Sequence, residues 1–366
     1  MKGGPLTIVI AGGGTGGHLY PGLAVARALV ARVPEAQVSF AGTSRGLEAR
    51  VVPEAGFALD LIRSRGLKGK SIANRLRGAA LLPAGLLDAW RLLSRRRPHV
   101  VVGVGGYSSG PVVLLASLRG MATMVLEQNA VPGLTNRWLA PFVRAAAVNY
   151  ERTLVHFRGK GFVSGNPVRA EFVGVEGDAP RAAHPPRVLI VGGSQGAHAI
   201  NVAMAAAAPE LVRQCPAVEI VHQTGARDCE WVQSQYDAAG IRARVVAFLD
   251  GMAAEMTAAD VVVSRAGATT LAELAALGRP AIFIPLPTAT DDHQRKNAQV
   301  LVDLGAARLV DERLLTQPEG PVRLAGAIAG LVADEAGRAS MRTAMRAAAR
   351  PGAADAIVSR ILELAA

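Results

Sequence analysis

The feature that most constrains this chain is an apolar segment that runs into a glycine-rich turn, and it occurs twice. The first segment, Leu6–Ala11, leads into residues 12–18, and the second, Arg187–Val191, leads into residues 192–198. Continuous apolar strands are typical of parallel sheets covered by helices on both faces. The repetition therefore predicts an α/β protein made of two doubly wound, Rossmann-like domains.

Between and after these repeats, short apolar strands alternate with longer helical segments. The pattern restarts near residues 164–168, so we expect domains of 1–164 and 165–345. Ligands of such sheets bind beyond the carboxyl ends of the strands, and two sheets facing each other would enclose a cleft. The other expected strands are Val38–Ala41, His99–Val104, Met124–Leu126, Val218–His222, Val245–Phe248, Asp260–Ser264 and Ala281–Ile284.

The positive charge is concentrated in the first half. Residues 1–164 carry 21 Lys and Arg against 7 Asp and Glu, whereas residues 165–366 carry 19 against 22. This asymmetry indicates an anionic partner for the first half: a phosphorylated substrate, an anionic membrane surface or a nucleic acid. Aromatic residues make up only 4% and no nucleic-acid-binding module is visible, which disfavours nucleic acid.

The sequence predicts no bilayer-spanning segment. The longest suggestive apolar stretch, Gly78–Leu87, has ten residues, and the N-terminus enters a strand without a signal-peptide pattern. Cys215 and Cys229 lack metal-binding or redox spacing and fit a reducing compartment. We therefore expect the protein to stay in the cytoplasm.

The first glycine-rich turn has two interpretations. Residues 12–17 contain G-x-G-x-x-G, which lets a backbone approach a phosphate or sugar closely. A dinucleotide site would need an acid at the end of the next strand; residues 40–43 provide none, although Arg45 could meet a 2′-phosphate. A tight turn without a ligand is the alternative. A second loop, Gly105–Pro111, follows the strand His99–Val104 and favours a shared site.

The second half offers helix starts suited to a diphosphate. The loop Gly192–Ala197 and the segment Ser264–Thr270 each follow a strand and open a helix, where N–H groups and the dipole favour anions. Glu273 could accept hydrogen bonds from ribose hydroxyls or complete a capping box with Thr270. Asp291–Gln294 suits sugar hydroxyls, a helix N-cap or, less well, a metal.

Two further features carry alternatives. His18 closes the first loop and is either a general base for a hydroxyl or a structural histidine. A helical stripe of apolar residues is flanked by Lys and Arg, and is either an interfacial membrane helix or a helix packed on its own sheet. The stripe consists of Leu82, Leu86, Trp90 and Leu93.

Taken in order, these motifs resemble the MurG family over essentially the whole chain. Single motifs are shared with other nucleotide-sugar enzymes, but the ordered set is far more specific. The matching segments are Gly12–His18 with Pro21–Ala24, Gly105–Pro111, Glu127–Gly133 with Thr135–Asn136, Gly165–Arg169, Gly193–Ala197, His222–Gly225, Phe248 with Met252, Ser264–Ala268, Glu273, and Asp292–Gln294 with Asn297–Ala298.

The resemblance implies a B-type glycosyltransferase fold and an inverting reaction without cofactor or active-site metal. N-acetylglucosamine would pass from UDP-N-acetylglucosamine (UDP-GlcNAc) to the muramoyl 4-hydroxyl of undecaprenyl-diphospho-muramoyl-pentapeptide, in peptidoglycan synthesis. The enzyme would be peripheral on the cytoplasmic face of the plasma membrane, bound to its anionic surface, with cell-wall synthesis and division proteins as candidate partners. The last helix, about 346–366, would pack back on the first domain.

The resemblance also implies roles for individual residues. His18 would be the general base, and Glu273 would bind the ribose. The membrane contact follows from the apolar stripe and not from the resemblance: in its interfacial interpretation, which the basic first half favours, Leu82, Leu86 and Trp90 would meet the membrane. The remaining substrate-binding residues would be Thr15, Gly16, Gly17, Asn129, Arg169, Ser194, Gln195, Leu249, Ala268, Thr269, Thr270 and Gln294.

Three other classes compete with this reading. An NAD(P) oxidoreductase would explain the first loop but leave the second half unused. A membrane scaffold would not explain the polar segments Glu127–Gly133 and Asp292–Gln294. A transferase acting on another lipid acceptor, such as diacylglycerol, would keep the UDP site and change the first domain's loops.

Overall fold

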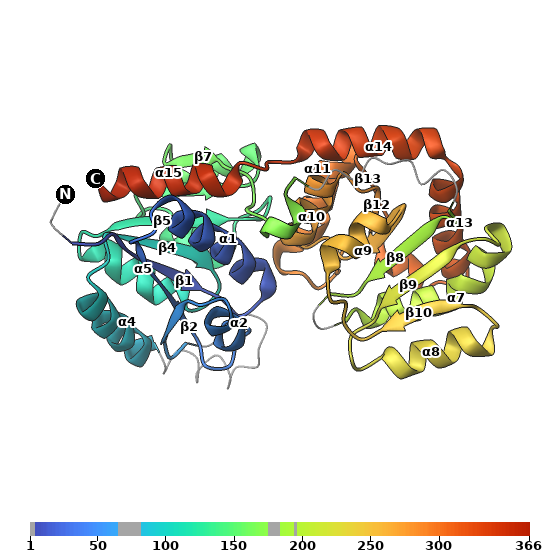
Figure 1. Cartoon of the computed structure of the whole chain (residues 1–366), viewed down its shortest axis with the longest axis horizontal. Coiled ribbons are helices and arrows are strands. Elements are labelled where there is room, and N and C mark those ends of the chain that lie inside the picture. The colour runs from blue at the N-terminus through green and yellow to red at the C-terminus, as the bar shows by residue number, and fades with distance from the viewer. Residues whose placement is uncertain (1–3, 65–81, 175–183, 194–195) are drawn as a thin grey trace. The chain divides into compact units, whose positions relative to one another are not determined.

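The computed structural model describes residues 4–64, 82–174, 184–193 and 196–366. It comprises two compact units, the first made of residues 1–170 and 350–366 and the second of residues 171–349 (Figure 1). Each unit is built on a parallel β-sheet with crossover helices. The prediction of two doubly wound, Rossmann-like domains is confirmed. The first unit extends to residue 170, a few residues beyond the expected boundary at residue 164.

The first unit contains, within the described residues, a sheet in the order β3-β2-β1-β4-β5-β6-β7. Alternate residues of β1 point to opposite faces, so Ile8 and Ile10 pack in one core cluster and Val9 and Ala11 in another. The strands are β1 (Thr7–Gly12), β2 (Gln37–Gly42), β3 (Ala58–Leu61), β4 (Val100–Gly105), β5 (Ala122–Glu127), β6 (Ala145–Val148) and β7 (Gly161–Val163).

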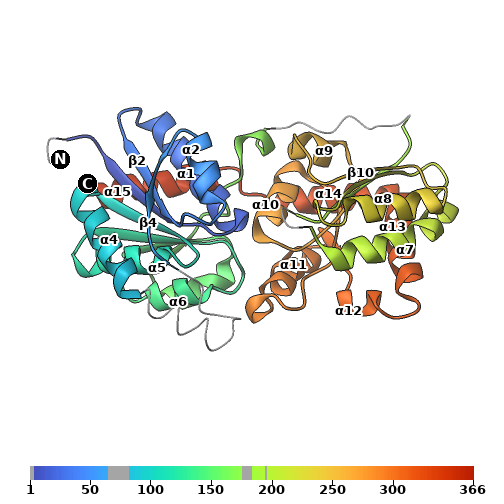
Figure 2. The same cartoon turned by 90° about the horizontal axis from the view of Figure 1, so that it is seen from below.

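Helices cover both faces of this sheet. The core cluster of Val9 and Ala11 includes side chains of α4 and α5, and Figure 2 shows α4, α5 and α6 gathered on one side of the unit. The helices are α1 (Gly16–Arg32), α2 (Glu48–Glu54), α4 (Leu82–Arg96), α5 (Ser109–Leu118), α6 (Leu134–Leu139) and α15 (Ala353–Ala365), with short 3₁₀ turns at Glu151–Phe157 and Ala170–Phe172.

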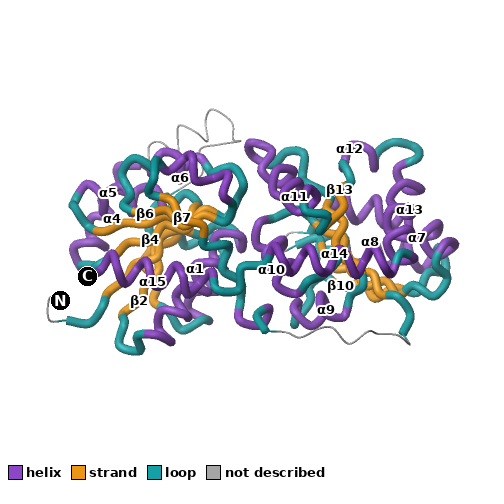
Figure 3. The backbone as a smooth tube through the Cα atoms, turned by 90° about the horizontal axis from the view of Figure 1, so that it is seen from above, coloured by secondary structure: helices purple, strands orange, loops and turns teal. Residues whose placement is uncertain are grey.

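The end of the chain returns to the first unit. Helix α15 lies beside α1 (Figure 3), and its Ile357, Val358 and Ile361 are fully buried with Ile8 and Ile10. The preceding helix, α14 (Glu335–Ala348), belongs to the second unit. The two helices are separated at Pro351-Gly352, where proline lacks the N–H that a continuous helix would need.

The second unit contains, over its described part, a sheet in the order β10-β9-β8-β11-β12-β13. Side chains of β8, α7 and α13 form one core cluster. The strands are β8 (Arg187–Val191), β9 (Glu219–Gln223), β10 (Ala243–Val246), β11 (Val261–Ser264), β12 (Ala281–Phe283) and β13 (Ala307–Leu309). The remaining helices are α7 (His198–Gln214), α8 (Cys229–Ala238), α9 (Met252–Ala258), α10 (Ala268–Leu277), α11 (His293–Asp303), α12 (Glu312–Leu315) and α13 (Gly320–Ala333), with a 3₁₀ turn at Thr290–Asp292.

Candidate active site

In the first unit, the two glycine loops touch at the carboxyl edge of the sheet. Strands β1 and β4 are neighbours, so the turns that follow them lie side by side. A methyl group added at Gly106, where φ is +82°, would lie 2.5 Å from the Gly13 carbonyl oxygen. Only glycine fits this close approach, which joins the two loops into one surface.

His18 lies on this surface. It is the third residue of α1 and half-buried. A methyl group added at Gly105 would be 3.0 Å from Cδ2 and 3.1 Å from Nε2 of His18, so the imidazole lies directly against that glycine. Thr15, Gly16 and Gly17 form the cap and first turn of the same helix.

A buried carboxylate that the sequence analysis missed holds the first loop. Glu48 accepts hydrogen bonds from the Gly14 N–H (2.7 Å), the Thr43 N–H (2.9 Å) and the Thr43 hydroxyl (2.8 Å). Burial acts to raise the pKa of Glu48, but the hydrogen bonds outweigh it and the pKa is lowered. A phosphate bound to this loop would be repelled by the negative charge of Glu48. It could not bond to the Gly14 N–H, which already donates to Glu48. The arrangement therefore argues against a dinucleotide site here.

A second buried carboxylate shapes the loop after β5. Glu127 accepts hydrogen bonds from the Asn129 N–H (3.0 Å), the Asn129 side chain (3.1 Å), the Gly133 N–H (2.9 Å) and the Asn136 side chain (2.8 Å). Burial raises the pKa of Glu127, and these bonds only partly oppose the shift. Glu127 thus fixes Asn129 at the same sheet edge as His18, by contacts that only the folded chain reveals.

Arg169 also belongs to this edge. Its guanidinium carbon lies 5.0 Å from the centroid of the Tyr20 ring, two residues after His18 in α1. A cation over an aromatic face is an attractive contact that also orients the side chain. The predicted residues Thr15, Gly16, Gly17, His18 and Arg169 are therefore grouped around the start of α1.

In the second unit, the end of β9 holds the glycine loop that follows β8. Gln223 accepts from the Gly193 N–H (3.0 Å) and donates to the Gly193 carbonyl (3.1 Å) and the Ala247 carbonyl (2.9 Å). A methyl group at Gly196, where φ is +72°, would lie 2.3 Å from the Thr224 carbonyl. The predicted residues Ser194 and Gln195 lie outside the described residues.

Beneath this loop runs a buried polar chain. The Tyr236 hydroxyl is 2.9 Å from His222 Nδ1, and His222 Nε2 is 3.1 Å from Asn201 Oδ1. Asn201 donates to the Thr224 carbonyl (2.9 Å) and to Asp228 (2.8 Å). Burial lowers the pKa of His222 to about 3, so the ring is neutral and donates from Nε2 to the Asn201 oxygen.

Helix α10 begins next to these loops. Its N-cap is Gly267, and the buried residues Ala268, Thr269 and Glu273 lie in its first two turns. Thr270 is inside the helix, so the capping box of Thr270 with Glu273 is wrong: the N-cap is Gly267, three residues before the position that interpretation requires. The half-buried Leu249 follows β10, next to the exposed Phe248.

The segment that starts α11 is organised by its own contacts. Asp292 occupies the N-cap position, as one interpretation predicted, but its side chain makes no capping bond. Gln294 accepts from the Leu286 N–H at 3.0 Å, which orients its amide. Across the described ranges, no three His, Cys, Asp or Glu side chains are grouped as metal ligands would be.

The apolar stripe on α4 divides between surface and core. Leu86 and Trp90 are 39% and 52% exposed, whereas Leu93 is fully buried against the sheet, as the packed-helix interpretation predicts for it. The side chain of Leu82 lies outside the described part. Sequence analysis missed other exposed apolar side chains nearby: Leu118 of α5, Trp138 of α6 and Phe142, three residues after the end of α6. No helix in the described ranges is long and apolar enough to cross a membrane.

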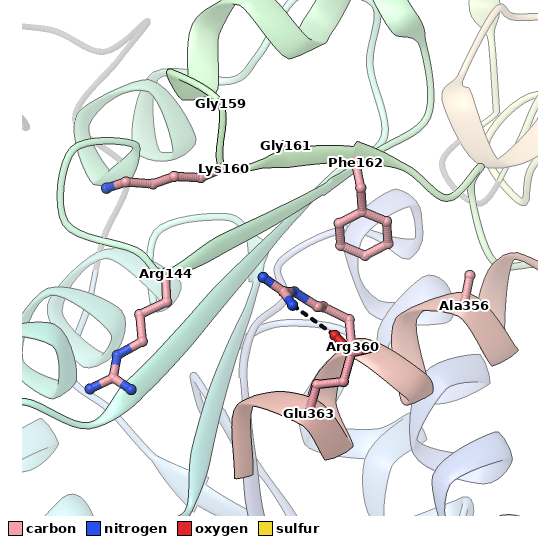
Figure 4. Close-up of a pocket in the computed structure, with 8 residues that line it drawn as sticks. All are labelled: Arg144, Gly159, Lys160, Gly161, Phe162, Ala356, Arg360 and Glu363. Atoms are coloured by element: carbon pink, nitrogen blue, oxygen red, sulfur yellow. Dashed lines mark hydrogen bonds and ion pairs between the residues drawn. The ribbon is translucent and has the colours of Figure 1, made fainter. Parts of the chain in front are cut away.

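A separate cavity of about 450 Å³ lies at the amino end of the first unit's sheet, where β6 and β7 begin, and not at the carboxyl edge that carries His18. Figure 4 shows Arg144 and Lys160 extending away from Arg360. Their head groups bond to the Gly120 and Pro141 carbonyls, and Arg360 pairs with Glu363. The three cations that line this cavity therefore do not point toward a common position where an anion could bind.

Comparison with known proteins agrees with this architecture. Residues 8–148 match the glycosyltransferase family 28 N-terminal domain, and residues 187–357 match its C-terminal domain. The crystal structure of Acinetobacter baumannii MurG superposes with a TM-score of 0.77 at 30% identity, covering 98% of this chain and 100% of that one. A UDP-GlcNAc 2-epimerase from Neisseria meningitidis, at 13% identity and a TM-score of 0.69, shares the fold alone.

Two curated relatives have the same name, UDP-N-acetylglucosamine--N-acetylmuramyl-(pentapeptide) pyrophosphoryl-undecaprenol N-acetylglucosamine transferase. The protein of Anaeromyxobacter sp. (strain K) is 50% identical over 313 residues, 85% of this chain and 82% of that protein. That of Pelobacter propionicus is 45% identical over 351 residues, 90% of this chain and 92% of that protein. The fold and site therefore define a two-domain hexosyltransferase of the B-type fold. Within that class, the chain belongs to the MurG family.

Proposed function

We propose that this enzyme transfers N-acetylglucosamine from UDP-GlcNAc to the muramoyl 4-hydroxyl of undecaprenyl-diphospho-muramoyl-pentapeptide. The observation that carries the proposal is the 50% identity, over 85% of the chain, to transferases of that name. The geometry supplies groups suited to the chemistry: an imidazole among the first unit's loops and helix starts in the second.

His18 is the proposed general base. Its imidazole takes the proton of the 4-hydroxyl, whose oxygen attacks the anomeric carbon while the bond to UDP breaks, which inverts the configuration. The start of α10 faces the developing diphosphate charge with backbone N–H groups and the Thr269 and Thr270 hydroxyls. Thr15, Gly16, Gly17 and Asn129 are the proposed lining on the side of His18.

The donor is proposed to bind mainly to loops of the second unit. Glu273, one turn after Thr269, accepts hydrogen bonds from the ribose hydroxyls, and the Leu249 backbone contacts the uracil. Ser194 and Gln195 bind the UDP portion together with Arg169, and Gln294 bonds sugar hydroxyls. The support for these assignments is that the described ones among them lie in segments that follow the carboxyl ends of β7, β10, β11 and β12, on the side where doubly wound sheets bind ligands.

The first unit is proposed to meet the cytoplasmic face of the plasma membrane. Leu86 and Trp90 are exposed, and Leu118 of α5 adds a further apolar side chain. Arg119 joins the two helices by donating to the Ser94 hydroxyl at 3.2 Å. Apolar side chains among cations are the composition that anionic bilayer surfaces attract.

A transfer assay tests the reaction. Purified enzyme in EDTA receives labelled UDP-GlcNAc and either a short-chain muramoyl-pentapeptide lipid or diacylglycerol. We expect label only in the muramoyl lipid, with undiminished activity in EDTA. Transfer to diacylglycerol alone would identify the other acceptor class, and activity abolished by EDTA and restored by a divalent cation would contradict metal independence.

A further inference from the structure

Gln223, the last residue of β9, connects two loops of the second unit that are distant in sequence. Its Oε1 and one Nε2 hydrogen engage both polar groups of Gly193, and the other Nε2 hydrogen bonds to the Ala247 carbonyl. The Gly192 N–H also bonds to the Gln223 backbone carbonyl at 2.9 Å. One residue therefore holds the start of the glycine loop and the segment leading to Leu249.

The chemistry of these contacts requires an amide. Gln223 is only 2% exposed. Its side-chain oxygen accepts one hydrogen bond, and each of its two N–H groups donates one. A carboxylate could accept from the Gly193 N–H but would face two carbonyl oxygens without a proton to donate. An apolar side chain would lose all three of these bonds, which are the side-chain links between the Gly193 backbone and the Ala247 carbonyl.

The two loops are the ones assigned above to different parts of the donor. Residues of the Gly192–Ala197 loop are proposed to bind the UDP portion, and Leu249, two residues after Ala247, is proposed to meet the uracil. A ligand that bridges both loops is bound well only when their spacing is correct before binding, because ordering them during binding costs affinity.

We propose that Gln223 is a positioning residue for donor binding, setting the spacing between Gly193 in the glycine loop after β8 and the segment from Ala247 to Leu249. This inference rests on the proposed function. It requires no direct contact between Gln223 and UDP.

The test uses the full chain and UDP alone as the probe. Gln223→Met keeps the length of the side chain and removes all three bonds, and Gln223→Glu keeps one acceptor. We expect both variants to raise the Kd for UDP about tenfold or more in calorimetry, because the two loops would then have to be ordered during binding. In the transfer assay the KM for the donor should rise, and the KM for the acceptor should not.

A matched control separates positioning from stability. Tyr236→Phe removes the buried hydroxyl bonded to His222, on the residue before Gln223, without touching either loop. It should lower the melting temperature and leave the Kd for UDP unchanged. Wild-type affinity in both Gln223 variants, or equal weakening in Tyr236→Phe, would overturn the proposal.

A further variant distinguishes this failure from failure of the proposed function. If the wild type binds UDP and Glu273→Ala weakens binding while the Gln223 variants do not, only the positioning role is wrong. If the wild type fails to bind UDP, the donor assignment is wrong and the positioning role with it.

Discussion

At the scale of single residues, His18 gives the most direct test of the reaction. Replacing it by alanine removes the proposed base but leaves the second unit intact, so kcat should fall about 10²–10⁴-fold while the Kd for UDP stays unchanged. Steady-state kinetics and calorimetry measure the two quantities. His156→Ala, at an exposed histidine remote from the glycine loops in sequence, serves as control. A kcat within threefold of the wild type would refute the base role.

His222 allows a residue-scale prediction about pH. Its pKa is lowered to about 3 by burial, against an ordinary value of 6.5. Between these values the unfolded chain binds a proton that the folded chain does not, so stability falls as the pH falls below about 6.5. Lowering the pH from 7 to 5 should therefore cost about 2 kcal/mol through this one group.

The measurement uses urea unfolding followed by the fluorescence of Trp231, the tryptophan of α8, in a background with Trp90 and Trp138 replaced by Phe. His222→Gln should be less stable overall but should lose about 2 kcal/mol less between pH 7 and 5 than the parent. The exposed His156→Gln should follow the parent. An identical pH dependence in His222→Gln and the parent would show that His222 does not titrate in this way.

At the scale of elements, the two interpretations of α4, as a membrane-surface helix and as a helix packed on its sheet, apply to different faces of the helix. Leu93 and Leu92 are core residues, whereas Leu86 and Trp90 are exposed. The double variant Leu86→Ser, Trp90→Ser should weaken binding to anionic vesicles roughly tenfold or more, since each inserted side chain is worth about 1.5–3 kcal/mol. Its melting temperature should stay close to that of the wild type. Vesicle co-sedimentation and thermal unfolding measure the two effects.

Phe248→Ser is the matched control, because this aromatic is 59% exposed on the second unit. It should leave vesicle binding unchanged. If the α4 double variant binds vesicles as the wild type does, or if it unfolds at a much lower temperature, the interfacial role of α4 is wrong.

The elements also show what a sequence can predict. Long apolar strands such as β1 and β8 were predicted to within a residue or two, because burial on both faces imposes a continuous apolar run. The short strands β6 and β13 were missed. β6 has four residues, mostly alanine, and β13 has three residues of mixed polarity, so neither forms a long apolar run. The contacts of Glu48 and Gln223 were missed for a different reason: each joins segments that only tertiary folding brings together.

At the scale of the whole molecule, the chain completes its first unit with its last helix. Ile361 of α15 is fully buried with Ile8 and Ile10 of β1, more than 300 residues earlier in sequence. Ile361→Ala should cost about 2–5 kcal/mol through the lost contacts and the cavity left behind. Because the second unit has its own core, the loss should be confined to the first.

Hydrogen exchange measured by mass spectrometry can read the two units separately. In Ile361→Ala, the amides of β1 should exchange faster by a factor matching that free energy, and those of β8 should keep their wild-type protection. Glu363→Ala, on the exposed side of the same helix, should change neither by more than about 0.5 kcal/mol. Equal loss of protection in β1 and β8 would instead mean that the two units unfold as one cooperative body, with α15 stabilising both.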